Sequence, residues 1–224
     1  MELISIYFLY FIIYSFIGWC LEVFDKFFEF KRFINRGFLV GPICPIYGYG
    51  VLFILLIIGN TSHDLLSVFL KSIFICSVLE YFTSFIMEKL FKARWWDYSK
   101  YKFNINGRIC LETMLPFGIL GCLVVYIIHP YVIRIVSIIN PQLRIIFALI
   151  LFIIYLVDNI ISFNVMNKIK NEIKNHTADN TEIIKRKVLE FIDKNSVIYK
   201  HIRNAFPRFK IYKKLEGFRN DKVD

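Results

Sequence analysis

Five long apolar segments constrain this sequence more than any other feature. They run over about residues 3–24, 43–59, 65–87, 109–128 and 142–164. A helix needs about 20 mostly apolar residues to cross the hydrocarbon core of a bilayer. The content of 57% hydrophobic residues and the mean hydropathy of +0.53 lie outside the usual range of soluble domains. We therefore predict an all-α, polytopic transmembrane bundle of about five spans over residues 1–164, followed by a tail over 165–224.

Basic residues are concentrated in alternate connections between these segments. The first connection contains Lys26, Lys31, Arg32 and Arg36, and the third contains Lys89, Lys92, Arg94, Lys100, Lys102 and Arg108. The other two connections contain only Arg134. Because cytoplasmic loops are enriched in Lys and Arg, we predict an N-terminus outside and a C-terminus in the cytoplasm. Residues 129–141, bounded by two X-Pro pairs, are too short to span, and we expect an interfacial or re-entrant stretch there.

The tail is strongly basic, with 15 Lys and Arg residues against eight acidic residues after Asn164. Thr181 can cap a helix in which apolar residues recur at helical spacing until Pro207. A basic amphipathic helix beside a membrane favours contact with the inner leaflet or with the protein's own loops, and a docking helix for a partner is the alternative. No nucleic-acid-binding signature is present, so nucleic acid is not an expected partner.

Acidic residues within the apolar segments are candidates for function, because a charge in hydrocarbon is costly unless it is paired or wetted. The five acids are Glu22, Glu80, Glu88, Glu112 and Asp158. The predicted topology places all of them in the cytoplasmic half, with Glu80 deepest. Glu80, Ser84 and Glu88 share a helical face, and Arg108 and Glu112, four residues apart, can pair directly. The alternative for Glu22, Glu88 and Glu112 is that they only anchor helix ends at the interface.

The second segment is entered through a stretch rich in glycine and proline, residues 35–50. Irregular backbone at membrane depth is tolerated only against protein or a wet cavity. A helix that begins there would present free N–H groups to an anion. Close helix packing through Gly41, Pro45 and Gly48 explains the same residues equally well.

The cysteine and histidine residues predict no metal site. The five cysteines have no C-x-x-C spacing, and the four histidines are scattered. No phosphate-binding G-x-x-x-x-G-K-[ST] motif occurs, and no Ser-His pair suggests a reaction. The chain also begins without a basic region, so we expect neither a cleaved signal peptide nor a lipid anchor. We therefore expect no cofactor and no catalytic residue, and an enzyme is the less favoured class.

Several unusual short motifs, in a fixed order, resemble those of a bacterial membrane-protein family called ABC-transporter type IV, also labelled CmpB-like. They are Tyr14-Ser15-Phe16-Ile17-Gly18-Trp19 with Glu22, Asn35-Arg36-Gly37-Phe38, Gly41-Pro42 with Pro45-Ile46-Tyr47-Gly48, Glu80-Tyr81, Trp95-Trp96-Asp97-Tyr98 and Gly107-Arg108-Ile109. The resemblance covers about residues 10–125. It departs at Thr113 and Phe117-Gly118, where relatives tend to carry Ser and Trp-Gly.

The resemblance implies a permease component in the bacterial plasma membrane. Five spans are few for a complete transporter and the chain has no phosphate loop, so we expect a homo-oligomer or a complex with a separate ATPase subunit. Our leading hypothesis is a cytoplasm-facing cavity that binds a small polar or charged solute. Its expected binding residues are Glu22, Arg36, Glu80, Glu88, Arg108 and Glu112, supported by Trp19, Asn35, Gly41, Pro42, Pro45, Tyr47, Ser84, Trp96 and Asp97. The alternatives are a membrane-embedded enzyme acting on lipid headgroups and an envelope scaffold or regulator.

Overall fold

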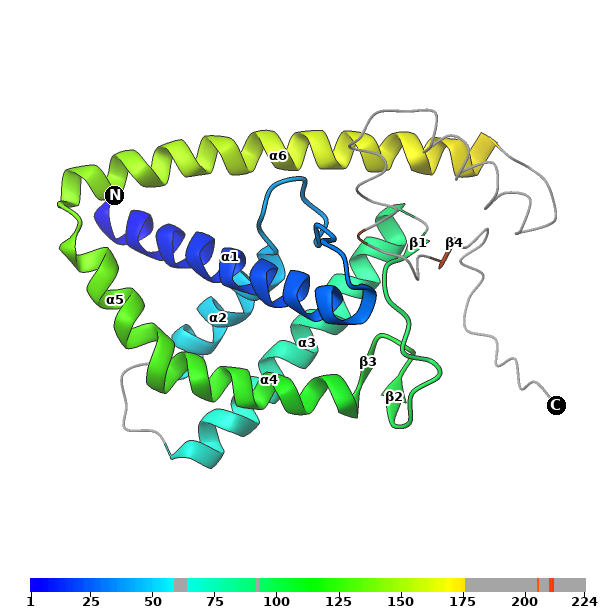
Figure 1. Ribbon diagram of the computed structural model, residues 1–224, viewed down its shortest axis with the longest axis horizontal. Helices are drawn as coiled ribbons and strands as arrows, with labels where there is room; N and C mark the ends of the chain where they lie inside the picture. The colour runs from blue at the N-terminus through cyan, green and yellow to red at the C-terminus, as the bar shows by residue number, and fades with distance from the viewer. Residues whose placement is uncertain (59–63, 92, 176–204, 206–209, 212–224) are drawn as a thin grey trace.

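Helices dominate the computed structural model, which describes residues 1–58, 64–91, 93–175, 205 and 210–211 (Figure 1). The helices are α1 (Glu2–Phe30), α2 (Pro45–Ile58), α3 (Leu65–Phe91), α4 (Leu111–Leu123), α5 (His129–Ile138) and α6 (Pro141–Asn175). The short strands are β1 (Ala93–Arg94), β2 (Asn104–Ile105), β3 (Ile109–Cys110) and β4 (Lys210–Ile211). The predicted all-α helical bundle is confirmed.

Within the described part of the chain, four helices are long and apolar enough to cross a membrane. They are α1, α3, α6 and the continuous helix Leu111–Ile138. Helix α2 has 14 residues, which corresponds to about 21 Å at 1.5 Å per residue. The hydrocarbon core is about 30 Å thick. The segment predicted over 43–59 is therefore helical, but it is shorter than a full span.

Helices α4 and α5 form one bent helix, which corrects the expectation for residues 129–141. A proline inside a helix usually breaks or kinks it, because its ring clashes with the preceding turn and it lacks an N–H group. A π-helical turn over Val124–Ile128 lies directly before it, and the N–H group of His129 bonds to the carbonyl group of Val124. The wider turn lets the helix continue past the proline with a change of direction (Figure 1). Residues 129–138 are therefore the end of a long helix and not a separate re-entrant stretch.

The segment between α1 and α2 is irregular, as its glycines and prolines predicted. Residues 31–44 form no helix or strand, and Pro45 begins α2, where a missing N–H group costs little. The segment is bonded to α1, because the N–H group of Cys44 donates to the carbonyl oxygen of Ser15 at 2.9 Å. The segment therefore brings its polar residues beside the C-terminal half of α1.

Small residues allow the helices to approach closely. A Cβ atom at Gly48 of α2 would meet the Ser15 hydroxyl group and the main-chain oxygen of Phe11 on α1. Gly18 of α1 lies in the same way against the ring of Tyr47. The predicted close packing is thus confirmed at Gly48.

Helix α6 packs on α1 and touches α3, but most of its surface is uncovered. Only 11% of the residues in its apolar stretch are buried, so most of its side chains would face lipid in a bilayer. The amphipathic helix predicted after Thr181 lies outside the described residues. Beyond Asn175 the structure describes Ala205, which is buried, and β4, which pairs antiparallel with β1.

Candidate functional site

Four polar side chains form a buried stripe along one face of α3. Ser77, Glu80, Ser84 and Glu88 recur every three or four residues, which places them on one side of the helix. Each is at most 7% exposed. Polar groups buried among apolar helices need partners, so the bonds along the stripe distinguish the parts that are satisfied from those that are not.

The Glu88 end of the stripe is fully paired. The carboxylate accepts from Arg94 Nε at 3.0 Å and from an Arg108 guanidinium nitrogen at 2.9 Å. Arg108 also donates to the Ser84 hydroxyl group at 3.1 Å, and Arg94 lies 3.6 Å from a carboxylate oxygen of Asp97. We call these four charged residues the Glu88 cluster. Its contacts fasten the loop after α3 to the helix, so its evident role is structural.

A tight hairpin places Arg108 in this cluster. Asn106 and Gly107 have φ angles of 53° and 65°, and the N–H group of Arg108 donates to the carbonyl group of Ile105 at 3.0 Å. Two positive φ angles at the centre of a hairpin turn are the reason for an Asn-Gly pair. Trp96 Nε1 donates to the carbonyl oxygen of Arg108 at 3.0 Å, which fixes the hairpin against the preceding loop.

A second group of polar side chains joins α1 to α2 and to the segment between them. The Glu22 carboxylate accepts from Tyr47 Oη at 2.8 Å and from Arg36 Nε at 3.3 Å. Trp19 Nε1 donates to Asn35 Oδ1 at 2.6 Å, and the amide of Asn35 donates to the carbonyl oxygen of Val40 at 2.8 Å. Glu22 therefore has both a cationic and a phenolic partner.

Glu80 lies between these two groups and is only partly satisfied. Its Oε1 atom accepts from Tyr98 Oη at 3.2 Å, whereas its Oε2 atom is buried without a hydrogen-bond partner. Thr113 lies beside the same carboxylate, but its hydroxyl group donates to the carbonyl oxygen of Cys110 at 2.9 Å. Burial and the neighbouring Glu80 carboxylate raise the pKa of Tyr98, which keeps this phenol protonated as a donor. Glu22 is close enough to act electrostatically on Glu80.

Asp158 of α6 holds the irregular segment in place. Its carboxylate oxygens accept from the N–H groups of Val40 and Gly41 at 2.9 and 2.8 Å. The Ser162 hydroxyl group adds a third bond at 3.3 Å. These two N–H groups belong to the irregular segment before α2, and they are bonded to the protein's own carboxylate.

Comparison with known families decides the family of this chain. A family model described as "Putative ABC-transporter type IV" matches residues 9–163. The chain belongs to this family. The sequence resemblance is therefore confirmed, and the protein is a multi-pass membrane protein of a transport-related family. Glu22, Glu80, Glu88 and Asp158 all lie inside the matched region, while the tail lies beyond it. Neither curated proteins nor solved structures gave a match.

The sequence suggested a set of site residues for this family member. Most of them fall into the two groups beside Glu80. The Glu88 cluster and its neighbours include Ser84, Trp96, Asp97 and Arg108, and the Glu22 group includes Trp19, Asn35, Arg36 and Tyr47. Gly41 bonds to Asp158 through its N–H group, Pro45 begins α2, and Pro42 is exposed.

Glu112 does not join these groups, and the expected pair with Arg108 is absent from the described contacts. Arg108 precedes β3, whereas α4 begins only at Leu111, so the two residues do not share a helix. Glu112 is exposed on the first turn of α4. The guanidinium group of Arg108 instead contacts Glu88, which the hairpin brings near.

Sequence reasoning missed Tyr98, Arg94 and Ser77 as members of the site. Tyr98 and Arg94 stood in a segment whose aromatic residues are typical of a membrane interface. A polar residue one turn before an intramembrane acid, as Ser77 is to Glu80, was an available signal. Nothing in the sequence indicated that Asp158 would bond to main-chain N–H groups.

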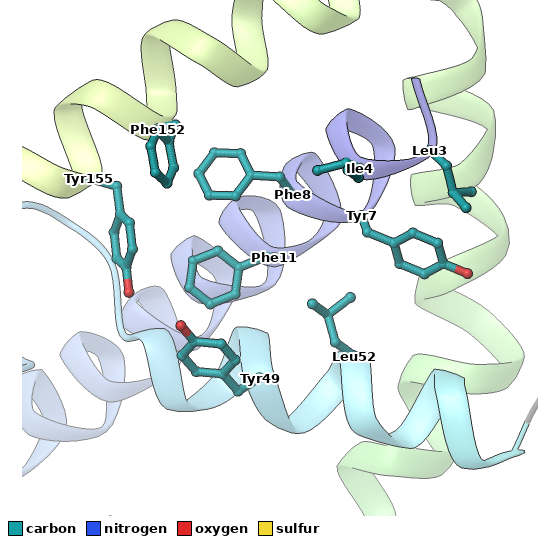
Figure 2. A pocket seen from close by; sticks show the side chains of 9 residues that line it. All are labelled: Leu3, Ile4, Tyr7, Phe8, Phe11, Tyr49, Leu52, Phe152 and Tyr155. Carbon is teal, nitrogen blue, oxygen red and sulfur yellow. The ribbon is translucent and has the colours of Figure 1, made fainter. Parts of the chain in front are cut away.

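One pocket of about 420 Å³ lies elsewhere and is apolar. It lies between α1, α2 and α6, and contains none of the predicted binding residues (Figure 2). Its lining consists of Leu3, Ile4, Tyr7, Phe8, Phe11, Tyr49, Leu52, Phe152 and Tyr155. The hydroxyl groups of Tyr49 and Tyr155 point toward each other in Figure 2. Within the described ranges, no group of three or more His, Cys, Asp and Glu residues could hold a metal ion.

Proposed function

We propose that this protein is the membrane-embedded component of a transport system in the bacterial plasma membrane, and that it binds a small polar or charged solute at Glu80 from the cytoplasmic side. One observation carries the proposal. Glu80 is 7% exposed, has one unpartnered carboxylate oxygen and has no ion pair among the described residues. Its neighbours Glu22 and Glu88 are both paired with arginine.

An ionisable group inside a membrane is costly, and it is usually retained for function when structure does not require it. Glu88 has a structural use, because two arginines from the following loop converge on it. Glu80 makes one hydrogen bond to Tyr98 and fastens no cationic side chain. The family match adds the transport-related setting.

The surrounding groups give Glu80 a polar environment without satisfying it. Tyr98 holds one carboxylate oxygen in place, and the paired Glu22 and Tyr47 provide a second polar wall from α1 and α2. The basic residues of the two loops beside these groups favour a cytoplasmic location. The chain has no phosphate-binding loop, so ATP hydrolysis would require a separate subunit.

The test compares solutes in bacterial cells that express the full chain or its variants at equal membrane levels. Mass spectrometry of cell extracts and medium would record which small polar solutes differ between wild-type cells and cells without the protein. We expect Glu80→Gln to abolish that difference, because it removes the charge without changing the side-chain length. The matched control, Glu112→Gln, changes an exposed carboxylate outside both groups and should keep it.

Two outcomes would contradict the proposal. If Glu80→Gln preserves the wild-type solute pattern, the carboxylate is not the solute-binding group. If deletion of the tail abolishes function while Glu80→Gln leaves it intact, the scaffold or regulator alternative gains support.

A further inference from the structure

The polar stripe of α3 is satisfied at one end and unsatisfied at the other. At its C-terminal end, Glu88 and Ser84 accept hydrogen bonds from arginine. Glu80 has one bonded and one unbonded oxygen, and the Ser77 hydroxyl group, one turn further, has no hydrogen-bond partner. Glu80 and Ser77 are 7% and 5% exposed. Two residues three positions apart on one face of α3 therefore each have a buried oxygen atom without a partner.

The charges around these atoms leave one carboxylate uncompensated. Glu22 is paired with Arg36, and the Glu88 cluster combines two arginines with two carboxylates. Asp158 has no cationic partner among the described residues, but two main-chain N–H groups and one hydroxyl group stabilise it. Glu80 has neither a cation nor enough donors. An ionised Glu80 would therefore need one positive charge from outside the described residues.

We propose that Glu80 Oε2 and Ser77 Oγ bind one monovalent cation, either an alkali ion or ammonium, in exchange for a proton. The inference rests on the proposed function and names the solute, or the coupling ion, as a cation. Without the cation, Glu80 is a neutral carboxylic acid, because an isolated buried carboxylate is too costly. When the cation enters, the O–H bond of Glu80 breaks, the proton passes to water, and the carboxylate contacts the cation. Carboxylate and hydroxyl oxygens are the ligands that hard cations prefer.

A single charge fits this site better than a double charge. Divalent cations bind most often to several carboxylates or to carboxylates with phosphates. Here the other nearby carboxylates are engaged by arginine or by main-chain N–H groups. Binding a divalent cation would leave an excess positive charge in the membrane.

Thermal unfolding of the purified full chain provides the first test, with sodium, potassium, ammonium and choline chloride at equal concentrations. A ligand that binds only the folded state raises the midpoint, by about 5–10 °C at roughly 100 times its Kd for a chain of this size. We expect such a rise with at least one small cation relative to choline. Ser77→Ala should weaken the cation dependence, and Glu80→Gln should remove it while remaining folded.

Labelling with a hydrophobic carbodiimide provides the second test, because this reagent attaches to protonated carboxyl groups within membranes. We expect peptide mass spectrometry to find the label on Glu80 and not on the arginine-paired Glu88. The cation that raises the midpoint should protect Glu80 from labelling. A midpoint rise that persists in Glu80→Gln, or labelling of Glu80 that no small cation reduces, overturns the inference.

These tests separate the cation site from the proposed function. If no cation binds but Glu80→Gln still abolishes the solute difference in cells, the cation assignment fails and the transport role stands. If a cation protects Glu80 but Glu80→Gln leaves the solute pattern unchanged, the cation site stands and the transport role fails.

Discussion

Replacing Glu88 with Gln removes the charge shared by the buried Arg108 and the partly buried Arg94. The Glu88 side chain is 6% exposed, and its oxygen atom accepts from Arg94 at 3.0 Å and from Arg108 at 2.9 Å. A hydrogen bond to a charged group contributes about 1.5–3 kcal/mol, and removing one member of a buried ion pair costs about 3–5 kcal/mol. Gln keeps one acceptor oxygen, so we expect Glu88→Gln to lower the free energy of unfolding by about 3 kcal/mol.

The buried thiols of the protein provide an assay for this change. Cys44 and Cys110 are buried and unpaired, so a thiol-reactive fluorophore will report their exposure on heating. A loss of about 3 kcal/mol corresponds to a fall of roughly 6–12 °C in the midpoint for a chain of this size. The matched control is Glu29→Gln, at an exposed pair with Lys26, where surface ion pairs contribute about 0–1 kcal/mol. A midpoint for Glu88→Gln equal to that of the control would refute a structural role for the Glu88 cluster.

Three further predictions concern packing, the irregular segment and topology. Gly48→Ala should lower the free energy of unfolding by about 1–3 kcal/mol, because the added Cβ overpacks against α1. Gly50→Ala, whose Cβ would meet only ordinary contacts at 3.6 and 3.7 Å, should not destabilise the protein. The thermal midpoints of the two variants test this difference. Asp158→Asn removes the charge that holds Val40 and Gly41, so Cys44 should react faster with maleimide in the folded protein, and an unchanged rate would contradict this. A C-terminal green fluorescent protein should fluoresce, and a C-terminal alkaline phosphatase should be inactive; the reverse would place the tail outside.

Hydropathy was sufficient to predict the helical segments but not their continuity. Helices α1, α3 and α6 contain the predicted apolar segments, because a bilayer span demands length and apolarity that the sequence displays directly. The continuity of α4 and α5 across Pro130 depends on a π-helical turn that no periodicity indicated. The shortness of α2 depends on where the irregular segment ends, and this is set by contacts with α1 and α6.

The sequence indicated several residues of the candidate site, but it did not indicate which of them contact each other. Position within the spans was enough to select Glu22, Glu80 and Glu88, since intramembrane acids are rare. Arg108 was assigned to Glu112 by helical spacing, although the Asn-Gly pair before it indicated a turn. Its contact with Glu88 follows from that turn. Long-range contacts of this kind depend on the three-dimensional packing, which one sequence does not reveal.

Glu80 and Glu88 lie on the same face of α3 but have different proposed roles. Glu80 is proposed to bind the solute, and Glu88 is proposed to stabilise the fold. The most direct measurement is the solute difference that Glu80→Gln produces in cells, taken with the thermal midpoint of the same purified variant. We predict that the solute difference is lost while the midpoint in choline chloride stays within about 2 °C of wild type, since no ion pair is broken. A variant that keeps the wild-type solute pattern, or that loses it only by unfolding, would contradict the assignment of Glu80.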